Sequence, residues 1–334
     1  MVQEGSFEEE KELKGKDGIT VIVPFLNEEE ALPIFCKTMD DYVRTLNFPV
    51  ELVFIDDGSC DGSVEIVRGY EFQNVASAKL LVLSRNFGFH SAVRAGIKNA
   101  SYDICTWFGA DLQEPLEILP LAYEKISSGN VEVVYFSKKT IKISKMERLF
   151  SRIYSHLMKK YAISTYSSEG TATVVFGKKI RDLLNENVEA NSQVVLQIMN
   201  MGFKYANISL DYNARSAGSS KWTFSKKIKA FIDSFVAFSF VPIRMVSIIG
   251  MVIFLVGIVI GMMTIINKIV NPDVQAGYST IACILSLGFG MTNISLGIIA
   301  EYLWRTLEAS RKRPVYVISD IEELRLPSSE SERK

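Results

Sequence analysis

The chain has 334 residues, with 37 Lys and Arg against 38 Asp and Glu, and 48% of its residues are hydrophobic. This length exceeds one average domain and suits a globular domain with an appendage. The balanced charge argues against a nucleic-acid-binding protein, which is usually basic, so we expect no nucleic acid among its partners.

Residues 1–17 are mostly Glu, Lys and Gly, and we expect a mobile tail there. No basic segment followed by an apolar one marks the N-terminus, so the sequence shows no secretory signal pattern. The cysteines have no metal-binding or redox spacing. We therefore expect reduced cysteines and a globular part that stays in the cytosol.

Short apolar runs alternate with helical segments through the first part of the chain. We expect strands at residues 18–24, 50–55, 79–83, 103–108 and 132–136. Later segments predict strands at 171–176 and 203–210 and helices at 138–161, 178–187 and 193–201. The helix at 138–161 is basic and amphipathic, typical either of a membrane surface or of an ordinary surface helix. The alternation favours an α/β fold with a mostly parallel sheet.

Polar loops follow the first four expected strands. In an open α/β sheet the carboxyl ends of the strands lie at one edge, where ligands bind. That edge would gather Glu28, Asp56, Asp57, Arg85 and Asp111. Carboxylates can accept hydrogen bonds from a base or a ribose, and a cation or a metal ion can balance a diphosphate. The loops predict a nucleotide site, although no Gly-x-Gly-x-x-Gly follows the first strand and no P-loop follows any strand.

Residues 108–115, Phe-Gly-Ala-Asp-Leu-Gln-Glu-Pro, join the fourth expected strand to a helix opened by Pro115. Asp111 and Gln113 supply hard oxygen atoms, which can hold Mg²⁺ or Mn²⁺ against a phosphate. Alternatively, Asp111 only caps the following helix. These two interpretations weigh equally on this stretch alone, and the other loops at the same edge favour the metal site.

A loop at residues 213–222 places the cations Arg215 and Lys221 on either side of Gly and Ser residues. Such a loop can close over a phosphate; the alternative is a solvated linker. It leads into residues 223–240, where Phe and Ile share one helical face and Lys the other. That pattern is typical of a helix lying in a membrane interface.

Residues 245–266 and 274–300 carry no charge and are long enough to cross a bilayer. Lys and Arg concentrate outside this pair of stretches, so the positive-inside rule predicts cytosolic flanks and an external link. Beyond them, residues 313–318 could form an edge strand, either on a neighbouring protein or on the chain's own globular domain.

Six motifs occur in the order seen in one known family, at residues 23–28, 56–59, 84–88, 110–113, 215–221 and 239–244. Together they resemble the polyisoprenyl-phosphate glycosyltransferases, most closely the bactoprenol glucosyltransferases, with dolichol-phosphate mannose synthases as relatives. The resemblance covers roughly residues 18–318.

The resemblance implies a GT-A-type nucleotide-diphosphosugar transferase domain over residues 18–222. An amphipathic interfacial helix over 223–241, a two-helix transmembrane region over 242–304 and a cytosolic tail over 305–334 would follow. By position in the motifs, it implies that the nucleotide sugar is held by Pro24, Leu26, Glu28, Asp56, Asp57, Arg85, Ala110, Asp111 and Gln113. Asp111 and Gln113 would hold the Mg²⁺ or Mn²⁺ cofactor, and the residues expected to act in catalysis are Asp111, Arg215 and Lys221.

The resemblance also implies the reaction and its setting. A multi-pass protein of the inner or plasma membrane, with a cytosolic catalytic domain, would transfer one sugar with inversion to undecaprenyl or another polyisoprenyl phosphate. The favoured donor is UDP-glucose, which would supply glucose. The lipid-linked sugar would serve cell-envelope glycan modification, and the protein would assemble as a homotetramer.

The sequence departs from the family pattern at Gly109, where the motif has the first acid of Asp-x-Asp, and at Thr171 and Thr173, where an acid and an Arg are usual. These positions motivate an alternative hypothesis: a catalytically weakened paralogue that binds nucleotide sugar or lipid and scaffolds a glycan-assembly complex. A processive polysaccharide synthase is disfavoured, because the sequence offers two spans and no Gln-x-x-Arg-Trp motif.

Overall fold

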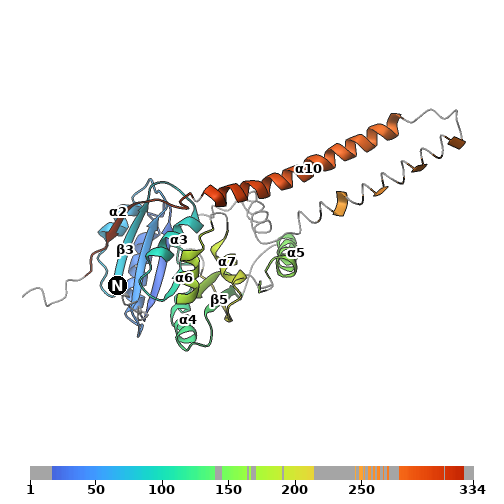
Figure 1. The fold of residues 1–334 in the computed structure, drawn as a ribbon. Coiled ribbons are helices and arrows are strands. Elements are labelled where there is room, and N and C mark those ends of the chain that lie inside the picture. Colours follow the sequence, from blue (N-terminus) through green and yellow to red (C-terminus); the bar gives the residue numbers. More distant parts are fainter. Residues whose placement is uncertain are drawn as a thin grey trace, which may run out of the picture.

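One mixed sheet organises the globular part of the computed structural model (Figure 1). The structure describes residues 17–139, 145–163, 165–166, 171–189, 192–213, 278–311 and 313–326, with scattered residues between 245 and 270. Residues 1–16 of the expected tail, the loop carrying Arg215 and Lys221, the interfacial helix and most of the link between the two uncharged stretches lie outside the described residues.

The strands are β1 (Ile19–Phe25), β2 (Val50–Asp56), β3 (Ser77–Leu83), β4 (Ile104–Trp107), β5 (Val133–Lys138), β6 (Thr173–Phe176), β7 (Tyr205–Leu210) and β8 (Ile318–Glu323). Within the described residues their order is β7-β5-β6-β4-β1-β2-β3-β8. Strands β1 to β4 run parallel, whereas β6 is antiparallel to β4 and β8 is antiparallel to β3. The predicted α/β class is therefore confirmed, and the parallel half of the sheet is the half with the polar loops.

The helices are α1 (Leu32–Val43), α2 (Ser63–Gly69), α3 (Phe89–Asn99), α4 (Ile118–Ser127), α5 (Lys145–Tyr161), α6 (Lys178–Glu186), α7 (Val194–Asn200) and α10 (Tyr278–Arg311). The expected helix at 138–161 begins later than predicted, because Lys138 still belongs to β5. The other predicted strands and helices shift by only a few residues, as is usual where chain ends fray.

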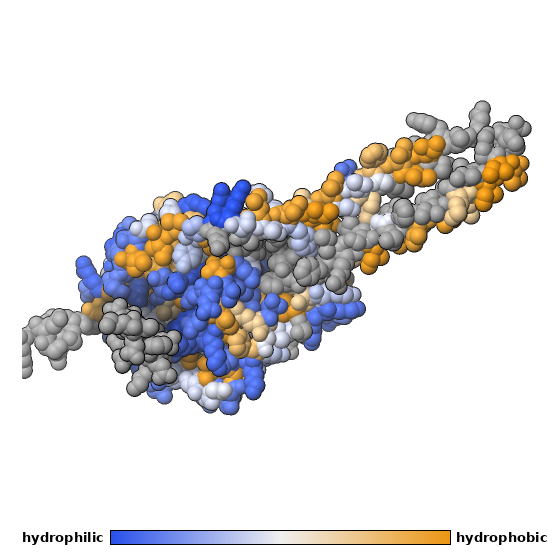
Figure 2. All heavy atoms as spheres, viewed as in Figure 1, coloured by the Kyte–Doolittle hydropathy of each residue, from blue (hydrophilic) through white to orange (hydrophobic). Residues whose placement is uncertain are grey.

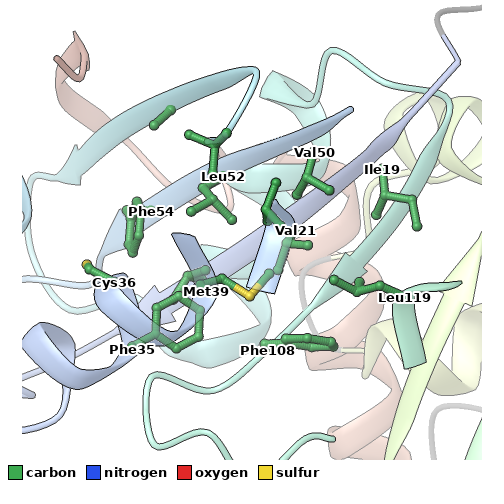
Figure 3. Close-up of a cluster of buried hydrophobic side chains, with 14 of the residues drawn as sticks. Ile19, Val21, Phe35, Cys36, Met39, Val50, Leu52, Phe54, Phe108 and Leu119 are labelled. Atoms are coloured by element: carbon green, nitrogen blue, oxygen red, sulfur yellow. The ribbon is translucent and has the colours of Figure 1, made fainter. Parts of the chain in front are cut away.

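Hydrophobic side chains from alternating strand positions build one core on each face of the sheet. Val21 and Val23 face α1, α2 and α4, whereas Ile22 faces α3, α6 and α7. Figure 3 shows part of the first core, where Phe35 and Met39 of α1 lie against the strands. Successive side chains of a strand point to opposite faces, so runs buried on both faces read as continuously apolar.

Helix α3 approaches the sheet unusually closely at Gly96. A Cβ atom at this position would lie 2.3 Å from Cγ2 of Ile22. The glycine thereby lets the backbone of α3 pack directly on β1 and β2.

The C-terminal segment docks on the chain's own domain, as strand β8. It pairs with β3 of the chain's own domain, and Arg68 of α2 forms an ion pair with Glu322. The strand covers Ile318–Glu323 and not the expected 313–318, because its ladder with β3 ends at Leu83. Just beyond that end, Ser84 N–H donates to Val317 O at 2.9 Å. Covering β3 in this way removes an exposed edge.

Helix α10 has 34 residues and extends away from the sheet (Figure 1). Its apolar side chains, such as Phe289 and Ile294, are mostly exposed, and apolar residues mark much of its length in Figure 2. Judged by length and apolarity together, none of the helices in the described part of the chain qualifies as a membrane span. The two predicted transmembrane helices are therefore not seen as such.

Candidate nucleotide-sugar site

Backbone and side-chain hydrogen bonds join the loop after β1 to the loop after β2. Asn27 takes a left-handed conformation, with φ of 52°, which Asn tolerates better than most residues. Its N–H donates to Ser59 Oγ at 2.9 Å, and its Oδ1 accepts from Cys60 N–H at 2.8 Å. Glu28 N–H donates to Ser63 Oγ at 2.8 Å. The two loops therefore form one rigid rim beside Pro24 and Leu26.

Asp56, the last residue of β2, and Asp57 are both buried, and they accept hydrogen bonds from the neighbouring turns. Asp56 Oδ1 accepts the Ser59 N–H at 2.9 Å. Asp57 accepts the N–H groups of Phe87 and Gly88, at 2.7 Å and 2.9 Å. Burial raises the pKa of Asp57, although these donors partly oppose the shift. Asp57 therefore positions the loop after β3 as well as bordering the site.

The loop after β3 lies directly against Gly58. A Cβ atom there would be 2.8 Å from the backbone nitrogen of Asn86, and Gly58 has φ of 82°, so a side chain is excluded. The guanidinium of Arg85 stacks 4.0 Å from the centre of the Phe87 ring. This stacking holds an exposed cation at the rim, close to the two acids.

The loop after β4 is tightly folded around Asp111. Phe108 N–H donates to Ile22 O at 2.9 Å, which seats the loop beside β1. Leu112 has φ of 52°, a conformation uncommon for a residue other than Gly or Asn. Gln113 Nε2 donates to Asp111 Oδ2 at 2.6 Å, and the Ala110 side chain is buried. The loop therefore fixes the Asp111 carboxylate, as a binding site for a hard cation requires.

Glu114 belongs to the same loop but was not among the predicted site residues. Its Oε2 accepts the Gly109 N–H at 3.1 Å. The pKa of Glu114 is raised to about 7, mainly by burial and also by the negative charge of Asp111. Backbone hydrogen bonds from Glu114 and Gly109 and the positive charge of Lys138 oppose this rise. The sequence signal for this residue was its position between Gln113 and a helix-opening proline.

A second group of side chains lies behind Glu114. Tyr212 donates its hydroxyl to Thr173 Oγ1 at 3.0 Å, and Lys138 Nζ lies 4.9 Å from the Tyr212 ring centre. Burial raises the pKa of Tyr212 to about 12, so this phenol is neutral at physiological pH. Thr173 thus stands in a network with Tyr212, at a position where the family pattern has a charged residue.

The chain returns to the Asp111 loop just before the segment that carries Arg215. Asn213 N–H donates to Gln113 O at 3.1 Å, and Asn213 Nδ2 donates to Leu112 O at 3.4 Å. Asn213 was not predicted as a site residue. Arg215 follows it by two positions in the sequence and, like Lys221, lies outside the described residues.

The structure thus brings together the predicted residues of the first four loops. Asp56, Asp57 and Arg85 meet on one side, and Asp111 and Gln113 on the other. In the described part of the chain, no group of three or more His, Cys, Asp or Glu side chains could hold a metal ion. The oxygen atoms of Asp111 and Gln113 could supply two ligands of a hard divalent cation that is shared with a phosphate, because such ions keep several non-protein ligands.

Parallel strands β1 to β4, with polar loops at their carboxyl ends and an acid-containing loop after β4, form an α/β domain of the GT-A transferase type. The chain belongs to glycosyl transferase family 2, whose model matches residues 20–186. The predicted resemblance to glycosyltransferases is therefore confirmed.

Curated relatives match nearly the whole chain. The undecaprenyl-phosphate 4-deoxy-4-formamido-L-arabinose transferase of Proteus mirabilis is 26% identical over 94% of this chain and 97% of its own. The prophage bactoprenol glucosyl transferase homolog of Escherichia coli K12 is 28% identical over 91% of this chain and 99% of its own. These matches extend well beyond the family domain, into the uncharged stretches.

Solved structures match more distantly. Glucosyl-3-phosphoglycerate synthase from Mycobacterium tuberculosis, in complex with Mn²⁺, UDP-glucose and phosphoglyceric acid, gives a TM-score of 0.47 at 16% identity over 66% of this chain and 79% of its own. The mannosyltransferase PcManGT from Pyrobaculum calidifontis, in complex with GDP-mannose and Mn²⁺, gives 0.43 at 15% identity over 90% and 83%.

Proposed function

We propose that this protein transfers one sugar from a nucleotide diphosphate to undecaprenyl phosphate or another polyisoprenyl phosphate, with inversion. The observation that carries this proposal is the fixed Asp111 loop beside the rim formed by the loops after β1, β2 and β3. Relatives whose names specify undecaprenyl phosphate match over nine-tenths of the chain, which supports a lipid phosphate as the acceptor.

The rim would hold the base and ribose of the donor. In this proposal the contacts come from Pro24, Leu26, Glu28 and Asp57, which lie at the end of β1 and β2 or shortly after them, and Arg85 adds a cation. Asp111 and Gln113 would hold Mg²⁺ or Mn²⁺ against the diphosphate. When bound, the ion neutralises charge on the departing nucleotide diphosphate.

The acceptor chemistry explains why this site can function with threonines at positions 171 and 173. The second pKa of a phosphate monoester is about 6, so the acceptor is largely dianionic at neutral pH. Such a nucleophile needs no strong general base, unlike a sugar hydroxyl. The protein must instead bring two anions together, and fixed cations and a metal ion do this.

Arg215 and Lys221 are our candidates for closing the site over phosphate. The support is the anchoring of Asn213 on the Asp111 loop, which delivers the chain to the site just before Arg215. Charge-assisted hydrogen bonds from Arg and Lys to phosphate oxygens would offset the cost of ordering the loop.

We further propose that residues 245–266 and 274–300 cross the inner or plasma membrane and that the protein assembles as a homotetramer. The exposed apolar side chains of α10 support a lipid environment, because exposed apolar surface of this extent marks an interaction site. The membrane would bring the lipid phosphate to the cytosolic domain, in a cell-envelope glycan pathway.

A donor panel tests the proposed reaction. Purified full-length protein would be offered radiolabelled UDP- and GDP-sugars with undecaprenyl phosphate and Mn²⁺, and the lipid-linked product measured. UDP-glucose is our favoured donor; the names of the relatives span two sugars, so 4-deoxy-4-formamido-L-arabinose belongs in the panel. Nucleotide-sugar binding without any lipid-linked product would instead support the weakened, scaffolding paralogue.

A further inference from the structure

We propose that Glu114 supplies a second carboxylate to the divalent metal ion of the donor site, in place of the acid that position 109 lacks. The inference rests on the proposed function, because it assumes that Asp111 and Gln113 hold a metal ion against a nucleotide diphosphate. It adds a residue outside the Asp-x-Asp-Leu-Gln pattern.

The geometry around Gly109 carries this proposal. A Cβ atom built there would lie 2.9 Å from Asp111 Oδ1 and 3.7 Å from Glu114 Oε2. Both carboxylates therefore border the point from which an aspartate at position 109 would extend. The Gly109 N–H, which donates to Glu114 Oε2 at 3.1 Å, holds the glutamate against this point.

The absence of a side chain at Gly109 is what makes room for this arrangement. An aspartate there would begin within 3.0 Å of Asp111 Oδ1, so the Asp111 carboxylate would have to move. With glycine, Asp111 keeps its bond to Gln113, and Glu114 keeps its bond to the loop backbone. The loop thus retains two acids on one side, although only one of them is in the family position.

The negative charge of the Glu114 carboxylate would raise the affinity of the site for a divalent cation. A hard divalent cation is held by carboxylate oxygens, and its affinity depends on the number of charged ligands. Asp111 alone would supply one negative charge to an ion that must also draw in an anionic diphosphate. A carboxylate from Glu114 restores the two acids that an Asp-x-Asp motif provides.

The competing explanation is purely structural: Glu114 accepts the Gly109 N–H and does nothing else. Glutamine can accept the same hydrogen bond through its amide oxygen but carries no charge. Glu114→Gln therefore removes the metal-binding charge and keeps the loop contact. Glu117→Gln is the matched control, since Glu117 is exposed, lies three residues further along and makes no side-chain capping bond to α4.

The first experiment titrates Mn²⁺, alone and then with UDP, into the full-length protein in detergent and follows free Mn²⁺ by electron paramagnetic resonance. We expect Glu114→Gln to weaken Mn²⁺ binding about tenfold or more, with an unchanged melting temperature, and Glu117→Gln to match the unaltered protein. Equal Mn²⁺ affinity in Glu114→Gln and the unaltered protein would overturn the proposal, and an unaltered protein that binds neither UDP nor Mn²⁺ would overturn the proposed function as well.

A measurement on the unaltered chain covers the case in which Glu114→Gln does not fold. Carbodiimide coupling followed by peptide mass spectrometry reports the accessibility of each carboxylate. Mn²⁺ with UDP should protect Glu114 and Asp111 and leave Glu117 labelled. Protection of Asp111 with unchanged labelling of Glu114 would exclude Glu114 as a ligand.

Discussion

At the scale of single residues, Asp111 is where the proposed chemistry depends most on one side chain. Asp111→Asn keeps the size and the contact with Gln113 but removes the charge that would bind the metal ion. We expect transfer to fall by about 100- to 1000-fold, the cost typical of losing one electrostatic contact to a transition state. The measurement is the rate of lipid-linked product formation.

Asp211→Asn is the matched control for this variant, because its carboxylate is exposed and lies 3.9 Å from Lys139 Nζ in a long ion pair. It should leave transfer unchanged. Near-normal turnover in Asp111→Asn would contradict the proposed role of Asp111 in binding the metal ion.

Glu51 shows how a buried charge can link stability to pH. Its carboxylate accepts hydrogen bonds from Thr20 and Ser101 and pairs with Lys79 at 3.0 Å. Burial alone would raise the pKa of Glu51, but these partners lower it overall. Because the folded pKa lies below the unfolded one, the stabilisation is present above the unfolded pKa and is lost as the pH falls through the folded pKa.

We therefore expect the free energy of unfolding to drop as the pH falls below the usual range of a glutamate pKa. Urea titrations at a series of acidic pH values measure this slope. Glu51→Gln should flatten it, and an unchanged slope in that variant would assign the acid sensitivity to other carboxylates.

At the scale of elements, the segment that contains β8 contributes to the hydrophobic core as well as pairing with the sheet edge. Leu324, immediately after the strand, is buried in the core with α1 and α4, and its N–H donates to Ala78 O at 2.8 Å. Leu324→Ala should reduce the free energy of unfolding by about 2–5 kcal/mol, the usual cost of a buried Leu→Ala change. Leu326→Ala, at an exposed position of the same segment, should change it by less than about 0.5 kcal/mol.

Chemical denaturation of both variants checks this expectation. Equal stability of Leu324→Ala and Leu326→Ala would mean that β8 docks without contributing to the core.

A second prediction at the scale of elements concerns the segment after Asn213, which carries Arg215. If Arg215 binds phosphate, Arg215→Ala should lower turnover strongly while folding and membrane insertion remain intact, because the polar loop predicted from the sequence would contribute little to stability. Proteolysis near Ser219 should slow when nucleotide and metal are added. Cleavage that is insensitive to nucleotide, to lipid phosphate and to both together would leave this segment as a linker.

At the scale of the whole molecule, the arrangement in the membrane is a prediction from charge. Lys and Arg flank the two uncharged stretches on their outer sides, so both termini should be cytosolic and the link at 267–278 external. A cysteine placed at Val274 should react with an impermeant reagent added to intact cells. Labelling that appears only after permeabilisation would contradict this topology.

The sequence by itself determined the class of fold and the edge of the sheet at which the predicted site lies. Apolar runs of strand length, each followed by a polar loop, allow few arrangements other than a parallel sheet with its loops at one edge. Asp56, Asp57, Arg85 and Asp111 could therefore be predicted as neighbours from local patterns alone, because strand direction places them together whatever the detailed packing.

Only the tertiary structure decided which of these side chains point at one another. The contact between Glu114 and Gly109 depends on the left-handed turn at Leu112, and the bonds from Phe87 and Gly88 to Asp57 depend on how closely two loops pack. The docking of β8 on β3 joins segments far apart in the chain. Such contacts follow from the mutual fit of whole elements, which no local pattern of residues encodes.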